Sequence, residues 1–283
     1  MSTATAMTIS PLIRTGLSAT EIAHWREHGW VAVPGFFTAK ETAALQQAVA
    51  DLQGRGLLRN VATDGDGKTH STNKRNLQLC PCGPHHRLLR ALPWHQRVVT
   101  SIESLLGPAV QELDQIFLKP AGDGAGTGWH TDNAYFKSDL KEAGTGMWIA
   151  INDAHRANGC IRILDRSHLR DWRHVRDNGS DHHITCAADV READAQHIEL
   201  AAGGVLFFNY GVAHATGANQ TERDRAGLAY HFRRTNTIVP EQTGNGFYLT
   251  NGALMHLSGA NCDGGRARHG EDLRGVFAEL TAR

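Results

Sequence analysis

The spacing of apolar and polar residues divides the chain into a helical N-terminal third and a region of short strands. Capping boxes begin at Ser18 and Thr38, where a hydroxyl side chain precedes a glutamate by three residues, and each predicts the start of a helix. Gly29 and Gly54 are expected to terminate these two helices. Between the helices, residues 30–37 alternate apolar and small side chains and predict a short strand followed by a turn.

Helical spacing returns once more before the pattern changes. Residues 95–106 place apolar side chains on one face, and Gly107 follows as a stop, so a third helix is expected there. The preceding residues, 54–84, are polar, contain glycine and show no period. They predict a long loop.

The rest of the chain consists mainly of short β-type runs separated by turn residues. Six runs are expected, at residues 110–119, 147–152, 160–164, 197–200, 205–210 and 228–233. Six short strands without intervening helices indicate a β-sandwich or a barrel, and such folds commonly reach this length as one domain. The prediction is therefore a single domain over residues 1–283, mainly β with flanking helices. The acidic and histidine-rich segment 171–196 looks like an insertion between strands.

Charge and composition narrow the classes of function. The 283 residues include 29 basic and 29 acidic side chains, and no run of five like charges marks a surface for nucleic acid or a membrane. The N-terminus lacks a basic region followed by an apolar run, and no stretch approaches the ~18 apolar residues of a membrane span. We therefore expect a cytoplasmic protein with a small-molecule substrate and without nucleic-acid or membrane partners.

Cysteine usage fits a reducing compartment. Five cysteines at uneven spacing do not suggest a disulfide framework. Cys80 and Cys82, followed by His85 and His86, could suggest zinc, but C-x-C is not the usual knuckle spacing and no second cysteine pair follows. A loop rich in cysteine and histidine is the favoured interpretation.

A histidine and an aspartate follow the glycine-rich residues 122–128. In an extended segment the side chains of His130 and Asp132 point the same way, because side chains alternate across a strand. One imidazole and one carboxylate then converge on one point. For this pair alone, in a chain with 17 histidines, a surface histidine beside a turn aspartate is the alternative.

A later strand offers a third ligand. Two glycines turn the chain before the strand predicted at residues 205–210, and His214 follows just beyond it. Two histidines and one carboxylate on one face of an octahedral ion form the facial triad of non-haem iron(II) oxygenases, which leaves three positions for co-substrate and oxygen. His130, Asp132 and His214 are therefore candidate ligands of iron(II).

An arginine strengthens this hypothesis. Arg225 lies eleven residues after His214 and opens the next predicted strand. A guanidinium clasps a carboxylate through two parallel hydrogen bonds, as the distal carboxylate of 2-oxoglutarate would require. The alternative is a surface charge beside Arg223 and Asp224, which would contribute little to stability.

The order and spacing of these four residues resemble the phytanoyl-CoA dioxygenase (PhyH) family of iron(II)- and 2-oxoglutarate-dependent oxygenases. The resemblance is most specific at residues 130–136 (HTDNAYF), 158–168 (NGCIRILDRSH) and 214–225. It implies a double-stranded β-helix, a jelly-roll barrel of the cupin kind, with helices packed against one side. The helical support would span about 18–107, the β-helix core about 110–235 and a C-terminal extension about 236–283.

Carried over residue by residue, the resemblance implies that the three candidate ligands bind iron and that Arg225 holds the 2-oxoglutarate carboxylate. It also implies that Thr216, Trp148 and Gln115 line the co-substrate pocket. The alternatives are a strand-end residue for Thr216, a core aromatic for Trp148 and a solvated strand residue for Gln115.

The chain departs from the family pattern in two places. Asp165 and Arg166 stand where the family often has Pro-Gly, so we expect a different turn and an extra charge pair facing the site. Residues 171–196 match no family residue, and substrate specificity is therefore not readable. The aspartate at 132 favours hydroxylation over halogenation, because halogenating relatives have a small residue there.

Substrate contacts are expected around the open face of the metal site. The candidates directly follow the H-x-D pair, lie on a long loop that could close as a lid, or follow Arg225 on its strand. They are Asn133, Tyr135 and Phe136; Asn73, Arg75 and Asn76; and His231 and Arg233. A solvated loop and a barrel surface are the alternatives for the last two groups.

The sequence thus predicts an iron(II)- and 2-oxoglutarate-dependent dioxygenase that uses O2 to hydroxylate a small-molecule metabolite and releases succinate and CO2. Two alternatives stay open: desaturation, epimerisation or cyclisation with the same cofactors, and a non-catalytic metal-binding barrel of the cupin type. Arg225 distinguishes the oxygenase from the non-catalytic barrel, because a metal-binding barrel needs no arginine at this position to hold a carboxylate. The motifs specify neither the substrate and its regiochemistry nor the oligomeric state.

Overall fold

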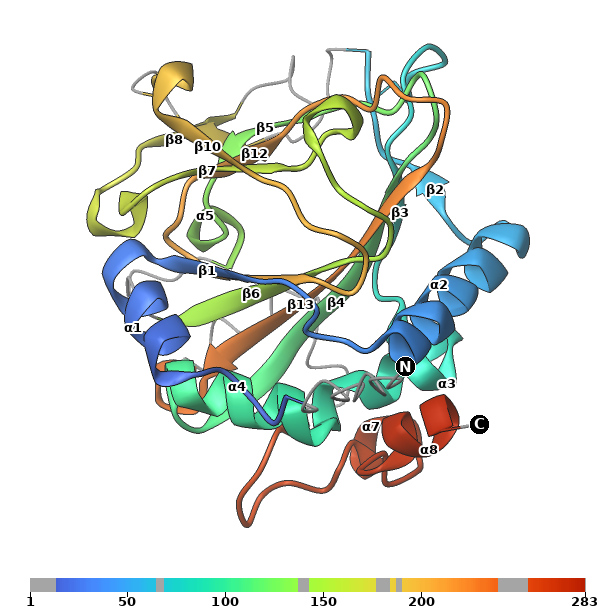
Figure 1. Cartoon of the computed structure of the whole chain (residues 1–283), viewed down its shortest axis with the longest axis vertical. Helices are drawn as coiled ribbons and strands as arrows, with labels where there is room; N and C mark the ends of the chain where they lie inside the picture. Colours follow the sequence, from blue (N-terminus) through green and yellow to red (C-terminus); the bar gives the residue numbers. More distant parts are fainter. Residues whose placement is uncertain are drawn as a thin grey trace, which may run out of the picture.

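Two antiparallel sheets face each other in the computed structural model, which describes residues 14–64, 69–136, 143–176, 184–186, 190–238 and 254–282 (Figure 1). The larger sheet has the strand order β1 (Trp30–Val33), β11 (Val205–Asn209), β6 (Gly144–Ala150), β13 (Arg225–Arg234), β4 (Ala109–Lys119), β3 (Leu77–Leu79) and β2 (Arg59–Asn60), and β14 (Met255–His256) also pairs with β4. The smaller sheet has the order β10 (Ala195–Ile198), β7 (Ile161–Leu164), β12 (His214–Thr216) and β5 (Thr127–His130). This is the arrangement expected of a jelly-roll barrel.

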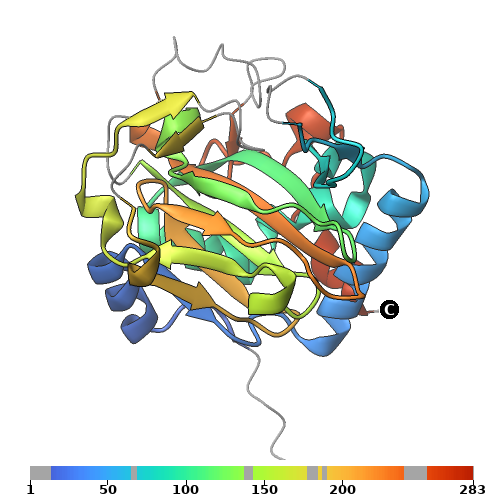
Figure 2. The ribbon, with the colours of Figure 1, turned by 90° about the horizontal axis from the view of Figure 1, so that it is seen from above.

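Helices cover the outer face of the larger sheet. The α-helices are α1 (Ala19–His28), α2 (Ala39–Gly54), α3 (Arg87–Ala91), α4 (Gln96–Leu106), α5 (Asn133–Phe136), α7 (Arg266–His269) and α8 (Val276–Ala282). Short 3-10 helices occur at Gly83–His85, Leu92–Trp94, Arg156–Asn158, Ser167–Leu169, Glu192–Asp194 and Thr235–Thr237. Figure 1 places α5 between the sheets, and Figure 2 shows α1 and α2 at opposite flanks of the strands. None of the helices in the described ranges combines the length and the hydropathy that a membrane span requires.

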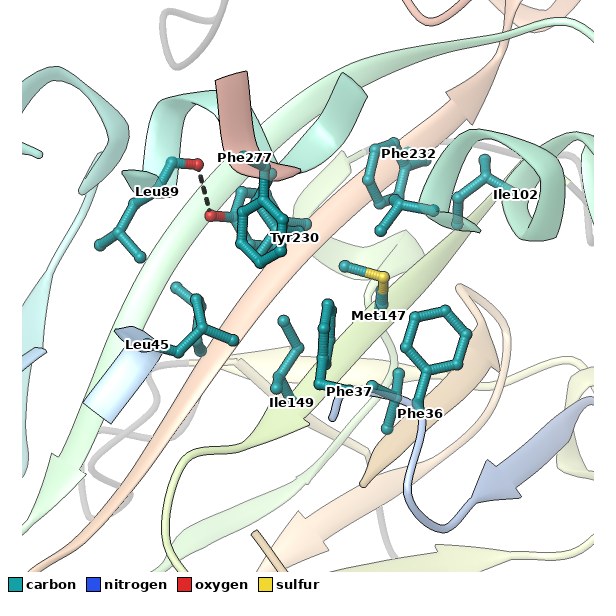
Figure 3. Close-up of a cluster of buried hydrophobic side chains, with 14 of the residues drawn as sticks. Phe36, Phe37, Leu45, Leu89, Ile102, Met147, Ile149, Tyr230, Phe232 and Phe277 are labelled. Atoms are coloured by element: carbon teal, nitrogen blue, oxygen red, sulfur yellow. Dashed lines mark hydrogen bonds between the residues drawn. The ribbon is translucent and has the colours of Figure 1, made fainter. Parts of the chain in front are cut away.

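The main hydrophobic core lies between the larger sheet and these helices. Met147 and Ile149 of β6 and Tyr230 of β13 are fully buried there with side chains of α2, α3 and α4 (Figure 3). The Tyr230 hydroxyl donates a hydrogen bond of 2.7 Å to the carbonyl oxygen of Leu89, so its polar end is satisfied. Burying each of these large side chains contributes about 1.5–3 kcal/mol, which anchors the sheet that carries the site.

Both faces of β13 are buried, and alternation directs its residues into two environments. Tyr230 belongs to the core beneath the helices, whereas Ala229 belongs to a second apolar cluster between the two sheets. Arg225, His231 and Arg233 share the parity of Ala229 and therefore face the smaller sheet. The polar residues of this strand are thus directed between the sheets.

Local capping signals place the N-terminal helices as predicted. Ser18 and Thr38 each accept the backbone N–H of the glutamate three residues on, and each glutamate side chain accepts in return from the cap residue's N–H. Gly29 ends α1 with a φ of 82°, and a Cβ at this position would overlap the ring of His168. Only glycine meets both conditions.

Some predicted boundaries are wrong. Residues 54–84, expected to form a loop, include β2 and β3, which extend the larger sheet. Strand β6 begins at Gly144 rather than at 147, because Gly144 and Gly146 lie beneath the rings of Tyr210 and Phe208, where a Cβ would overlap them. Glycine lowers the strand signal in the sequence, yet here it makes room for the two rings.

The segment 171–196 is not only an insertion. It contains the paired strands β8 (His174–Arg176) and β9 (Ile184–Cys186), and its last two residues are the first two of β10. Strand β10 covers residues 195–198 rather than the predicted 197–200, because it pairs with all four residues of β7.

Candidate metal centre

The smaller sheet brings two histidines together. His130 ends β5 and His214 begins β12, and the two are direct register partners with ring centroids 4.2 Å apart. Asp132 lies beyond the end of β5, in the turn before α5, so the extended backbone expected through this residue stops at His130. One ligand atom from each of the three buried side chains nevertheless lies within 4.8 Å of the other two.

Backbone carbonyls orient both imidazoles. The Nδ1 atom of His130 lies 2.8 Å from the carbonyl oxygen of Gly128, and that of His214 lies 3.0 Å from the carbonyl oxygen of Val212. A carbonyl oxygen can only accept, so each Nδ1 carries the proton and each neutral ring has its lone pair on Nε2. This is how ligand histidines are commonly held toward a metal.

The electrostatics of the cluster fit a divalent cation. Burial lowers the pKa of His130 to about 4 and raises the pKa of Asp132 to about 8. The Asp132 Oδ2 atom accepts no hydrogen bond in the described part of the chain. A buried carboxylate beside neutral imidazoles is stable when ionised only if a cation compensates it, and two imidazoles with one carboxylate suit iron(II).

Arg225 carries a buried positive charge that no carboxylate of the described residues neutralises. Its side chain is 1% exposed, and it donates to the carbonyl oxygen of Gly159 at 2.7 Å and lies over the Trp148 ring. Within the described ranges no carboxylate forms an ion pair with it, and burial lowers its pKa to about 10. A bound carboxylate would satisfy this guanidinium.

Thr216, Trp148 and Gln115 lie on strands that carry or adjoin a ligand or Arg225, and the Trp148 ring contacts the guanidinium. Thr216 follows His214 by two residues on β12, and its hydroxyl accepts the N–H of Thr127 at 3.0 Å. Trp148 and Gln115 both pair in register with the same residue of β13, on the face directed between the sheets. The Trp148 indole lies over Gly227, where a Cβ would overlap it.

The three predicted substrate residues after the H-x-D pair lie on α5. Tyr135 is 40% exposed and its ring meets the His130 ring edge-on at 5.7 Å. Phe136 stacks on Tyr210 with centroids 4.7 Å apart. The N–H of Asn133 donates to the carbonyl oxygen of Tyr210 at 3.0 Å. This short helix therefore starts directly after Asp132 and is held by Tyr210, the residue that follows β11.

His231 and Arg233 are both buried but make different contacts. His231 Nδ1 lies 3.4 Å from Asp132 Oδ2, and burial lowers its pKa to about 3. Arg233 pairs with Glu112 at 2.8 Å and donates to the carbonyl oxygen of Phe136 at 3.0 Å. Arg233 thus holds α5 in place through protein groups.

The three substrate candidates predicted within residues 54–84 have surroundings that do not include the triad. Arg75 pairs with Asp123 at 2.6 Å, Asn73 is exposed and Asn76 is buried. The ion pair between Arg75 and Asp123 and the backbone bridge between Arg75 and Gly124 join this part of the chain to the glycine-rich segment before β5. Neither contact is with a residue of the triad. Their predicted substrate contacts stay a hypothesis.

The turn at Asp165 and Arg166 faces α1, so the expectation that this charge pair faces the site is wrong. Asp165 lies 2.9 Å from Nδ1 of His28 and accepts the indole N–H of Trp30 at 3.0 Å, while Arg166 pairs with Glu27. Arg166 has a φ of 54°, which places it in the left-handed region that favours glycine.

Several contacts around the site were not predicted. His174, in segment 171–196, lies with Nε2 3.0 Å from the hydroxyl of Thr131, the residue between two of the ligands. From the same segment, Glu192 accepts the indole N–H of Trp129 at 3.0 Å. Lys119 is 2% exposed and directly opposite Arg225 in the sheet. Of these, only Lys119 has a signal in the sequence, as a charge directly after the apolar residues 116–118.

The triad is the sole group of three or more potential metal ligands found in the described ranges. Cys80 and Cys82 lie in those ranges and form no such group with the nearby histidines. Burial raises the pKa of the Cys82 thiol well above its usual value, which disfavours the thiolate that zinc requires.

Comparisons with known proteins identify a family for this chain. The model of the phytanoyl-CoA dioxygenase (PhyH) family matches residues 25–227. A phytanoyl-CoA dioxygenase domain-containing protein 1 homolog of Caenorhabditis elegans is 29% identical over 145 residues, which cover 48% of this chain and 50% of the relative. The ectoine dioxygenase of Halomonas elongata is 26% identical over 252 residues, covering 79% of this chain and 72% of the relative. The nematode relative is thus matched over half its length.

Solved structures share the fold. The epimerase SnoN, solved in complex with Fe3+, alpha ketoglutarate and nogalamycin RO, superposes with a TM-score of 0.65 at 21% identity, covering 84% of this chain and 98% of that one. EctD from S. alaskensis, solved with 2-oxoglutarate and 5-hydroxyectoine, gives a TM-score of 0.59 at 16% identity, covering 81% and 82%. The predicted fold class is confirmed.

Proposed function

The chain belongs to the phytanoyl-CoA dioxygenase (PhyH) family of iron(II)- and 2-oxoglutarate-dependent oxygenases, as predicted, and we propose that it hydroxylates a small-molecule metabolite with release of succinate and CO2. The observation that carries the proposal is a buried His-Asp-His cluster in the same inter-sheet space as a buried guanidinium that lacks a carboxylate partner among the described residues. A buried carboxylate and a buried guanidinium are each unfavourable when their charge is unpaired. Iron(II) would neutralise the charge of Asp132, and a carboxylate of 2-oxoglutarate would neutralise that of Arg225.

The roles of the residues follow from their orientation. His130 and His214 would hold iron through Nε2, because their Nδ1 protons are donated to carbonyl oxygens, and Asp132 would supply the anionic ligand. Bound iron would supply the oxygen activation that couples decarboxylation of the co-substrate to oxidation of the substrate.

Arg225 would bind the distal carboxylate of 2-oxoglutarate. Its guanidinium is already oriented by the carbonyl oxygen of Gly159 and by the Trp148 ring, so little conformational entropy is lost on binding. Burial of this side chain excludes water and strengthens the charge-assisted hydrogen bonds to the carboxylate.

A carboxylate at position 132 favours hydroxylation over halogenation, since it occupies the ligand position that a halide would need. The small-molecule assignment draws support from the ectoine dioxygenase relative, since ectoine is a small metabolite. The balance of 29 basic and 29 acidic residues offers no patch for a polyanion.

The test measures succinate formed from 2-oxoglutarate with added iron(II) in the wild type, Arg225→Ala and Arg223→Ala. Arg223 is exposed in the same turn and controls for loss of charge. We expect Arg225→Ala to raise the KM for 2-oxoglutarate by about 10- to 100-fold, as for loss of a charge-assisted pair, and Arg223→Ala to leave it unchanged. Turnover unaffected by Arg225→Ala would refute the co-substrate role.

A further inference from the structure

His231 occupies a confined position beside the metal ligands. It lies six residues after Arg225 on β13, on the same face of the strand, and is 4% exposed. Its ring packs against Phe136 and Tyr210, with centroids 5.1 and 5.8 Å away. These contacts keep the imidazole in the protein interior, where its two nitrogens need hydrogen-bond partners.

Two unsatisfied polar atoms face each other at this point. His231 Nδ1 and Asp132 Oδ2 lie 3.4 Å apart, and neither has a hydrogen-bond partner among the residues that the structure describes. The other carboxylate oxygen, Oδ1, lies 3.9 Å from Nε2 of His214. The two oxygens of Asp132 therefore have different neighbours, a ligand histidine for Oδ1 and His231 for Oδ2.

A pair of glutamines sets the direction of the hydrogen bonds. Gln78 donates its amide N–H to Oε1 of Gln115 at 3.0 Å. The oxygen of the Gln115 amide is thus an acceptor, and its nitrogen faces His231 Nε2 at 3.4 Å. An amide nitrogen can only donate, so His231 Nε2 accepts and the proton of the neutral ring lies on Nδ1, toward Asp132.

We propose that His231 is a positioning residue that donates its Nδ1 proton to Asp132 Oδ2 and reserves Oδ1 as the single oxygen for the metal. The proposal rests on the proposed iron site and assigns His231 a role other than the substrate contact expected from the sequence. A carboxylate that chelates through both oxygens occupies one more coordination position than a carboxylate bound through one. Holding Oδ2 away keeps three positions for co-substrate and oxygen.

A matched pair of variants separates hydrogen bonding from packing. His231→Asn keeps an N–H donor at the δ position, whereas His231→Leu fills similar space without a donor. The readout is Co(II) affinity, measured by chelator competition in the absence of 2-oxoglutarate, together with the d–d absorption of the bound ion, which reports its coordination number. We expect His231→Leu to bind Co(II) about 10- to 100-fold more weakly with a changed spectrum, and His231→Asn to restore most of both.

The wild-type protein provides a test that needs no variant to fold. In protein loaded with diamagnetic Zn(II), the 15N chemical shifts of the His231 ring should report the proton on Nδ1. The proposal is overturned by a proton on Nε2, by His231→Leu binding Co(II) like the wild type, or by His231→Asn being as weak as His231→Leu. Because 2-oxoglutarate is absent from each measurement, these outcomes leave the proposed role of Arg225 untouched.

Discussion

Loading the metal at neutral pH should release a proton from Asp132. In the metal-free protein burial holds the pKa of this carboxyl at about 8, so at pH 7 the protonated form exceeds the ionised form about tenfold. The pKa of His130 is about 4, so its imidazole is already neutral at this pH. Because a carboxylate must be ionised to bind a cation, Asp132 should release about 0.9 protons per metal ion at pH 7 and about 0.1 at pH 9.

Calorimetric titration of Co(II) in buffers that differ in ionisation enthalpy measures this number directly. The observed binding enthalpy changes linearly with the buffer enthalpy, and the slope gives the protons released. Asp132→Asn is the control, since an amide has no proton to release. A release that is the same at pH 7 and pH 9 would refute the argument that burial keeps the Asp132 carboxyl protonated.

In the metal-free protein the Asp132 pKa of about 8 lies above that of the unfolded chain, so stability should fall as pH rises from about 4 to about 8. Asp132→Asn should then raise the metal-free Tm at pH 8, and a lower Tm would contradict this. Gly227→Ala should displace the Trp148 indole at a strain of about 1–3 kcal/mol and weaken 2-oxoglutarate binding, with metal affinity as the unchanged control in calorimetry. Thr38→Ala should lower the free energy of unfolding by about 1 kcal/mol in urea titrations, through loss of the hydrogen bond to the Glu41 N–H; no change would remove the cap from the account.

Local signals predicted the parts of the fold that depend on neighbouring residues. The capping boxes at Ser18 and Thr38 satisfy N–H groups within their own helix turns, so their effect is readable without tertiary structure. The sequence did not predict the start of β6 at Gly144. Gly144 and Gly146 are needed because the rings of Tyr210 and Phe208, which lie far away in the sequence, pack directly over them. The start of β6 is therefore determined by tertiary packing and not by the strand preference of its residues.

The site, like the fold, has parts that the sequence predicted and parts that depend on tertiary structure. The sequence indicated the three candidate ligands and Arg225, because residue type and spacing carry that chemistry. It could not indicate that His231 faces Asp132, since this depends on the alternation of β13 and on a turn that ends β5 at His130. The contact of His174 with Thr131 was equally hidden in a segment without a recognisable pattern.

A crystal structure of the protein grown without oxygen in the presence of iron(II) and 2-oxoglutarate tests the central claim most directly. The account predicts one iron bound by Nε2 of His130, Nε2 of His214 and one oxygen of Asp132, with the distal carboxylate of 2-oxoglutarate on Arg225. Iron bound elsewhere, or a co-substrate carboxylate that does not contact Arg225, would contradict it.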